Sequence, residues 1–178
     1  MLVLLGMSAQ LSLAVTSYDD VKIAYVHKFL YFADWKDTAS DTLDVCFLGG
    51  NPARKHLMKL SKQVIKGKRV QTHSFSNTSD LERCEVIIPN KHLNPFIAKE
   101  LAFLKTNAIQ IVDSKRLFDS SGHIYLKKKG NHLVFDVNFD RLHDLNVSIK
   151  AQLLSVADNV ATPSSKRYVK NSKGSSTL

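Results

Sequence analysis

The histidines are the first residues to weigh as a source of metal chemistry. There are seven of them: His27, His56, His73, His92, His123, His132 and His143. No two are three or four residues apart, which is the spacing that places two imidazole ligands on one face of a helix. We therefore interpret them as scattered surface residues and expect no metal site.

The sequence also lacks motifs that would indicate nucleophilic or nucleotide chemistry. No GxSxG segment is present to form a nucleophile elbow. The segment GGNPARK has two glycines after an apolar run, but it lacks the lysine and hydroxyl spacing of a phosphate loop and the third glycine of a dinucleotide site. We interpret it as a strand-to-helix turn and expect a non-enzymatic protein without a cofactor.

The two cysteines, Cys46 and Cys84, are the remaining candidates for chemistry. In an exported protein they would form one disulfide, and in a cytosolic protein they would be two free thiols. They fall in the first and third predicted strands, which are commonly neighbours in a doubly wound sheet, so a bridge is geometrically reasonable. Closing a loop of about 39 residues would stabilise the fold by about 4 kcal/mol.

The first residues, MLVLLGMSAQLSLAVTS, bear on that choice. An apolar run is followed by Ser12 and Ala14, which are correctly spaced for cleavage by signal peptidase after Ala14. No basic residue precedes Lys22, however, and the alternative is an apolar N-terminal strand or helix of a cytoplasmic protein. We expect a signal peptide over residues 1–14, an α/β domain over 15–161 and a disordered basic tail over 162–178.

Length and charge set wider bounds. A chain of 178 residues that is 44% hydrophobic is long enough for one domain with a full core. The formal net charge of +9 would suit nucleic acid, anionic lipid or an acidic protein partner, although a solvated surface is the commoner case. Because the chain has no evident RNA-recognition or helix-turn-helix pattern, we expect no nucleic acid partner.

An aromatic amphipathic helix is predicted over residues 18–35. Its aromatic side chains are Tyr25, Phe29, Tyr31, Phe32 and Trp35. Core packing accounts for Phe29 and Phe32, whereas Tyr31 falls outside the main apolar stripe. We expect Tyr25 and Tyr31 to contribute to a partner or dimer surface.

Alternating strands and helices follow this first helix. Buried strands are predicted at residues 43–50, 84–90 and 108–113, with a more exposed strand at 66–75. Pro52 opens one helix, which should run to about Lys62, and Asn94 and Pro95 open another. In the second helix, Phe96, Ile97, Leu101 and Leu104 are predicted to share a face. This order favours a largely parallel sheet with helices on both faces.

The pattern changes after residue 113. Residues 123–138 form two alternating runs joined around Gly130, which predicts a hairpin, so the sheet should end in an antiparallel pair. A short helical turn is predicted at residues 142–145. The stripe of the last predicted helix is Ile149, Leu153, Val156, Ala157 and Val160. The predicted fold is thus a three-layer α/β sandwich with a mostly parallel central sheet, ending in an antiparallel hairpin and a C-terminal helix.

Six segments in this order resemble the YfiR family of small periplasmic regulators. VKIAYVHKFLYFADW is similar to the opening helix of the family, which ends at a tryptophan, here Trp35. LDVCFLGGNP resembles the first strand, with its cysteine and Gly49, and LERCEVIIPN resembles the strand that carries the second cysteine. IQIVDSKRLF resembles the strand that ends in aspartate, here Asp113, with Phe118 after it.

The last two segments extend the resemblance to about residue 160. SGHIYLKKKGNHLVFDVN is similar to the family hairpin and contains Gly122, Phe135 and Asn138. IKAQLLSVA resembles the final helix, with Leu153 and Leu154 as its paired leucines. Three residues depart from the usual pattern: Ser121 replaces the first of two glycines, Val134 replaces an arginine and Lys150 replaces a serine.

The resemblance implies a periplasmic repressor. It implies that the protein binds the periplasmic region of an inner-membrane diguanylate cyclase and so lowers cyclic-di-GMP signalling and biofilm formation. Envelope stress or sequestration by an outer-membrane lipoprotein would release the cyclase, and a homodimer is a further expectation. The resemblance also implies that the Cys46–Cys84 bridge makes repression sensitive to the periplasmic redox state.

The alternative is a periplasmic module that binds a small ligand. A doubly wound sheet has a crevice beyond the carboxyl ends of its strands. In this chain, that crevice would lie at the turns after Leu48, Ile88 and Asp113.

Overall fold

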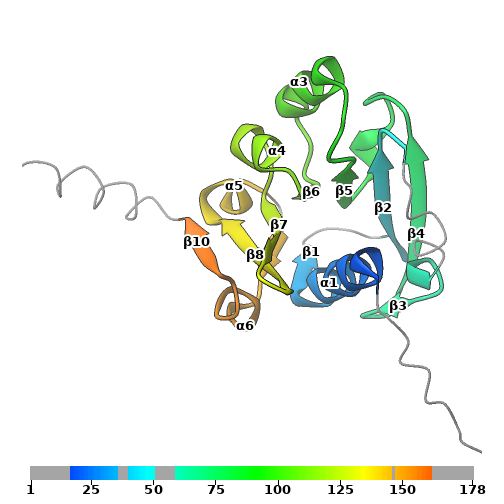
Figure 1. Cartoon of the computed structure of the whole chain (residues 1–178). Coiled ribbons are helices and arrows are strands. Elements are labelled where there is room, and N and C mark those ends of the chain that lie inside the picture. Colours follow the sequence, from blue (N-terminus) through cyan, green and yellow to red (C-terminus); the bar gives the residue numbers. More distant parts are fainter. Residues whose placement is uncertain (1–16, 36–39, 51–58, 146, 162–178) are drawn as a thin grey trace, which may run out of the picture.

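A central sheet with helices on both faces organises the part of the chain described by the computed structural model (Figure 1). The described residues are 17–35, 40–50, 59–145 and 147–161. The signal peptide predicted over 1–14, the tail predicted over 162–178 and most of the helix predicted from Pro52 lie outside them. No helix among the described residues is long and apolar enough to cross a membrane.

The central sheet has eight strands and is mixed. Its order is β10-β8-β7-β6-β5-β2-β4-β3. The strands are β2 (Thr42–Leu48), β3 (Val64–Ile65), β4 (Lys68–Phe75), β5 (Val86–Pro89), β6 (Ile109–Val112), β7 (Ile124–Lys129), β8 (His132–Asn138) and β10 (Asn159–Ala161). Antiparallel pairs occur at two places, β3–β4 and β7–β8, and the other neighbours run parallel.

The helices of the described residues begin in different ways, and only some of them have a side-chain cap. They are α1 (Tyr18–Phe32), α3 (Pro95–Phe103), α4 (Lys115–Ser120), α5 (Phe139–His143) and α6 (Ala151–Leu154), with a 3₁₀ turn at Leu81–Arg83. Ser17 accepts a hydrogen bond from the Asp20 backbone at the start of α1. Asn94 does the same for Phe96 at the start of α3, where Pro95 occupies the first turn.

Two apolar cores cover the two faces of the sheet. Because successive strand residues point to opposite faces, Val45 and Phe47 pack toward α1, whereas Cys46 and Leu48 pack toward α3 and α4. Figure 1 shows α1 and α6 on one side of the sheet and α3 and α4 on the other. The prediction of helices on both faces is therefore confirmed.

A small second sheet was missed by the sequence pattern. The first helix ends at Phe32, and Ala33 is extended with φ −88° and ψ 141°. Strand β1 (Ala33–Trp35) then pairs antiparallel with β9 (Val147–Ile149). The helix predicted as far as residue 35 is therefore three residues too long, because pairing with a distant strand decides where it ends.

The predicted C-terminal helix is wrong beyond its first turn. Helix α6 ends at Leu154, and Asn159–Ala161 form β10, which pairs parallel with β8. Of the predicted stripe, Ile149 belongs to β9, Val160 belongs to β10, and Val156 is 67% exposed. The apolar spacing that imitated one helix comes from three short elements that pack separately.

The β7–β8 hairpin is confirmed, but it is not the end of the sheet, because β10 pairs with its outer strand. Asp158 donates its backbone N–H to the Phe135 carbonyl at 2.8 Å as the chain enters β10.

A second correction concerns α3, where Phe96 is 69% exposed although it was predicted to share a face with Ile97, Leu101 and Leu104. The other three predicted residues do pack toward the core: Leu101 is buried together with Ala98, and Ile97 and Leu104 are partly buried against the same cluster.

Candidate functional site

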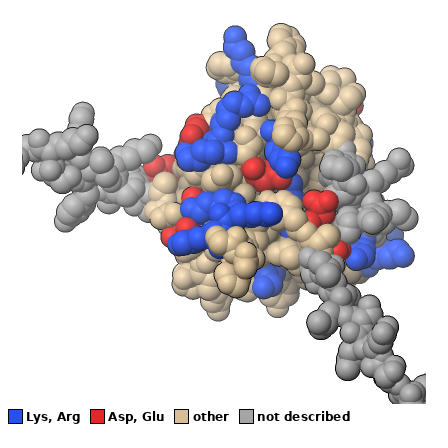
Figure 2. Space-filling view, in the orientation of Figure 1, with Lys and Arg blue, Asp and Glu red and all other residues tan. Residues whose placement is uncertain are grey.

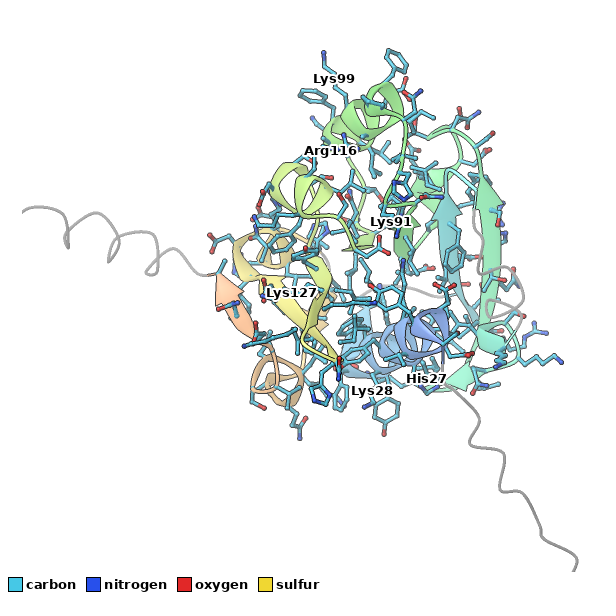
Figure 3. The ribbon with its side chains drawn as sticks, in the orientation of Figure 1. His27, Lys28, Lys91, Lys99, Arg116 and Lys127 are labelled. Carbon is cyan, nitrogen blue, oxygen red and sulfur yellow. A yellow bond between two sulfur atoms is a disulfide. The ribbon has the colours of Figure 1, made fainter. Side chains whose placement is uncertain are left out.

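A cleft of about 350 Å³ opens between the start of α1 and the carboxyl ends of three central strands. Its lining comprises Tyr18, Asp19, Lys22, Ile23, Phe47, Gly50, Ile88, Pro89, Asn90, Lys91, His92 and Asp113. Figure 2 shows acidic and basic side chains side by side on this face of the protein, and Figure 3 shows Lys91 near the middle of the same view. The cleft lies where the crevice was predicted, beyond the ends of β2, β5 and β6.

Local backbone geometry shapes the mouth of the cleft. Gly49 and Gly50 follow β2 with φ values of +84° and +73°, which side chains rarely allow. The Asn90 side chain donates hydrogen bonds to both of their carbonyls, at 3.2 and 3.1 Å. The turns after β2 and β5 are thereby fastened to each other.

A buried ion pair forms the wall of the cleft. Lys22 Nζ, from α1, lies 2.8 Å from Asp113 Oδ2, and the two side chains are 15% and 7% exposed. The other carboxylate oxygen, Asp113 Oδ1, is buried and has no hydrogen-bond partner among the described residues. Burial, together with the charges of Asp113 and Asp19, raises the pKa of Tyr18.

The predicted disulfide is present in the structure. Cys46 and Cys84 are bonded, with their Cα atoms 6.0 Å apart. Cys46 lies in β2, and Cys84 immediately follows the 3₁₀ turn and precedes β5, the parallel neighbour of β2. Both sulfurs belong to the core under α3, on the face of the sheet opposite to α1.

Two glycines of the family motif are required by close contacts. A Cβ atom at Gly122 would lie 2.8 Å from both the Phe118 backbone and Val112 Cγ2. At Gly49, a Cβ atom would lie 2.4 Å from Leu93 Cδ1. The preceding Ser121 has φ −148°, so it needs no glycine, and its hydroxyl donates to Gln110 Oε1 at 2.8 Å.

The motif residues Phe118 and Asn138 hold the turns around α4 and α5. The Phe118 ring, in α4, stacks on Tyr125, and Asn138 caps α5 by accepting from the Arg141 backbone. The Arg141 guanidinium donates to the Gly122 carbonyl at 3.0 Å and to the Asp119 carbonyl at 2.8 Å. Arg141 thus binds carbonyls at the C-terminal end of α4, a role that the sequence pattern did not reveal.

The other motif residues pack in the core beside α1. Phe135 lies edge-on to Phe29, with ring centroids 5.1 Å apart, and Leu153 is buried. Leu154 and Trp35 are partly buried against the same cluster. The buried Trp35 Nε1 atom has no hydrogen-bond partner within the described ranges.

The two tyrosines predicted at a partner surface differ in exposure. Tyr25 packs against Phe29 and Phe135, and its hydroxyl donates to the Leu133 carbonyl at 2.7 Å. Tyr31 is 52% exposed and contacts the Phe32 ring. Tyr31 is therefore the more accessible of the two to a partner.

One histidine contradicts the interpretation of these residues as surface groups. His123 is only 7% exposed, and its Nδ1 atom accepts a hydrogen bond from the Gln110 backbone at 2.9 Å. Burial and the nearby Arg141 charge lower the pKa of His123 to about 4. In the described part of the chain, no three His, Cys, Asp or Glu side chains gather in a way that could hold a metal ion.

The sequence pattern predicted that strand ends line the cleft, but it did not predict that α1 forms its other wall. Tyr18 and Lys22 approach Asp113 from a helix more than ninety positions earlier in the chain. A signal for Lys22 did exist, because it is a cation near the predicted buried face of an amphipathic helix.

The chain matches a known protein family. The family model described as YfiR/HmsC-like matches residues 19–158. No curated protein matches the sequence.

Proposed function

The chain belongs to the YfiR/HmsC-like family, and on that basis we propose that it is a periplasmic, non-enzymatic repressor of an inner-membrane diguanylate cyclase. The protein binds the periplasmic region of the cyclase and holds it inactive, which lowers cyclic-di-GMP and biofilm formation. The match over residues 19–158 carries this proposal, because it spans α1 to the turn before β10.

The proposed mechanism is a shift in population. A repressor lowers output only if it binds the inactive state of the cyclase more tightly than the active state. Envelope stress, or an outer-membrane lipoprotein that sequesters the repressor, then restores activity by removing it. The disulfide supports a link to redox state, because loss of the bridge would weaken the sheet that carries the repressor surface.

The test is co-expression of the full chain with a candidate membrane diguanylate cyclase, with cyclic-di-GMP as the readout. We expect the chain to lower cyclic-di-GMP and to co-purify with the cyclase. Unchanged cyclic-di-GMP with every membrane cyclase of the native host would contradict the proposal.

Tyr31 is the residue to probe for the partner or dimer surface. Tyr31→Glu places a charge on an exposed aromatic position of α1, and we expect it to reduce co-purification or the oligomeric state. Phe103→Glu is the matched control, because Phe103 is 75% exposed on α3, on the other side of the sheet. Equal behaviour of Tyr31→Glu and the unmodified chain would exclude the α1 surface.

A second candidate function is the binding of a small ligand. The cleft beside Asp113 favours it, because ligand pockets commonly span about 300 to 1,000 Å³ and combine apolar walls with a few polar groups. A thermal-shift screen of the full chain against metabolites tests this function separately from cyclase repression. A screen in which no compound raises the melting temperature would count against it.

A further inference from the structure

Asp113 is the residue in the cleft whose bonding is incomplete. Its side chain is 7% exposed, Lys22 pairs with Oδ2, and in the part of the chain that the structure describes Oδ1 has no hydrogen-bond partner. A buried polar atom without a partner costs about 1–3 kcal/mol, and such atoms in native proteins usually have a specific explanation. A ligand in the cleft would explain the missing partner of Oδ1, because Asp113 lines the cleft.

We infer that the cleft binds a small molecule that presents a neutral hydrogen-bond donor, a hydroxyl or amide N–H group, to Asp113 Oδ1. The inference deepens the second candidate function and does not depend on cyclase repression. It names the chemistry of the ligand and the residue that selects it. The torsion that turns an aspartate carboxylate is broad, so Oδ1 can face a donor in the cleft without leaving its rotamer.

The ion pair determines the charge of the donor. Lys22 already neutralises Asp113 at 2.8 Å, so a second cation at Oδ1 would be repelled by the Lys22 ammonium. A neutral donor satisfies Oδ1 without that repulsion. The site therefore discriminates against amines and in favour of hydroxyl and amide groups.

The apolar lining determines the body of the ligand. Ile23, Phe47, Ile88 and Pro89 line the cleft beside the ion pair. Aromatic or aliphatic groups gain free energy when they leave water for such a surface. A compact ring that carries one neutral donor fits both parts of the site.

The experiment uses three probes of similar size and the full chain. Benzamide has a ring and a neutral N–H donor, acetophenone has the same ring with an acceptor alone, and benzylamine has a cationic donor. Binding is followed by the backbone NMR signals of Gly50, Asn90 and Lys91 at the mouth of the cleft. We expect benzamide to bind at least about tenfold more tightly than either of the others, because it alone completes the bonding of Asp113.

Asp113→Asn provides a second test, in which the preference for benzamide should disappear. The amide oxygen of the substituted side chain should face the Lys22 ammonium, so its NH₂ group faces the cleft. Both benzamide and acetophenone carry a carbonyl oxygen that can accept from this NH₂ group, so benzamide should lose its advantage and the two probes should bind about equally. Asp119→Asn is the control, because Asp119 is an exposed carboxylate on α4 that pairs with Lys115, and the preference for benzamide should persist.

Equal binding of benzamide and acetophenone to the unmodified chain would overturn the inference, as would no change in the cleft signals with any probe. This comparison remains decisive even if Asp113→Asn does not fold. Neither outcome bears on the proposal of cyclase repression, which is tested by the level of cyclic-di-GMP.

Discussion

At the scale of single residues, His123 connects two strands of the sheet through its backbone and its ring. Its N–H donates to the Gln110 carbonyl, its carbonyl accepts from Asn138, and its Nδ1 accepts from the Gln110 N–H. The imidazole must be neutral at Nδ1 to accept that bond. Burial and Arg141 favour the same neutral form, with a pKa of about 4.

The depressed pKa of His123 predicts a loss of stability in mild acid. Between about pH 6.5 and 4, the unfolded chain binds a proton at this histidine and the folded chain does not, so the free energy of unfolding falls as pH falls. The full effect is about 3 kcal/mol. Urea unfolding at pH 7.5 and 4.5 measures it, and His123→Gln should remove this part of the pH dependence. His132→Gln, at an exposed position, should leave it unchanged.

Replacing Gly122 by alanine should cause a steric clash that the same change at the exposed Gly130 does not cause. Gly122→Ala forces a methyl group to 2.8 Å from the Phe118 backbone, which cannot move without shifting α4, and should cost about 3 kcal/mol. Gly130→Ala meets nothing within 4 Å in the β7–β8 turn and should cost about 1 kcal/mol, from its φ of +60° alone. Chemical denaturation of both variants measures the difference. Equal costs would show that the packing at Gly122 relaxes.

At the scale of elements, α6 begins at a residue that does not cap it. Lys150 occupies the N-cap position with φ −62° and ψ 139°, but its side chain makes no capping hydrogen bond. The resemblance places a serine there in relatives. This departure therefore affects the start of α6 and leaves the apolar contacts of Leu153 in place.

Restoring that cap should stabilise the protein. Lys150→Ser supplies a hydroxyl that can accept from the backbone N–H groups at the start of α6 and should raise the free energy of unfolding by about 1 kcal/mol. Thermal unfolding checks this, with Lys150→Ala as the control for losing the lysine side chain. A gain of the same size in both variants would show that capping is not its cause.

Elements with strong local signals were predictable, and elements defined by distant pairing were not. Neighbouring residues alone indicate the caps at Ser17 and Asn94 and the alternating strands of residues 123–138. Strands β1, β9 and β10 are three residues each, too short for a periodic pattern, and they form because a partner strand accepts their hydrogen bonds. The misread last helix has the same cause.

At the scale of the whole molecule, the disulfide joins β2 to the segment just before β5, its parallel neighbour, across 38 positions of the chain. Replacing Cys46 and Cys84 by alanine removes a constraint on the unfolded chain, and should lower the free energy of unfolding by about 4 kcal/mol. Urea denaturation of the double variant and of the oxidised protein measures this. Ellman titration of the denatured, oxidised protein should detect no thiols, and two titrating thiols would contradict the bridge.

The sequence by itself determined the local features: the caps, the buried runs, the hairpin, the cysteine pair and the family resemblance. The tertiary structure alone decided which residues meet at the cleft, because Lys22 and Asp113 are 91 positions apart and become neighbours only when α1 packs across the ends of β2, β5 and β6. It also decided that one oxygen of Asp113 is left without a partner. Local pattern is set by short-range sterics and hydrogen bonding, whereas the bonding of a buried charge depends on every element packed around it.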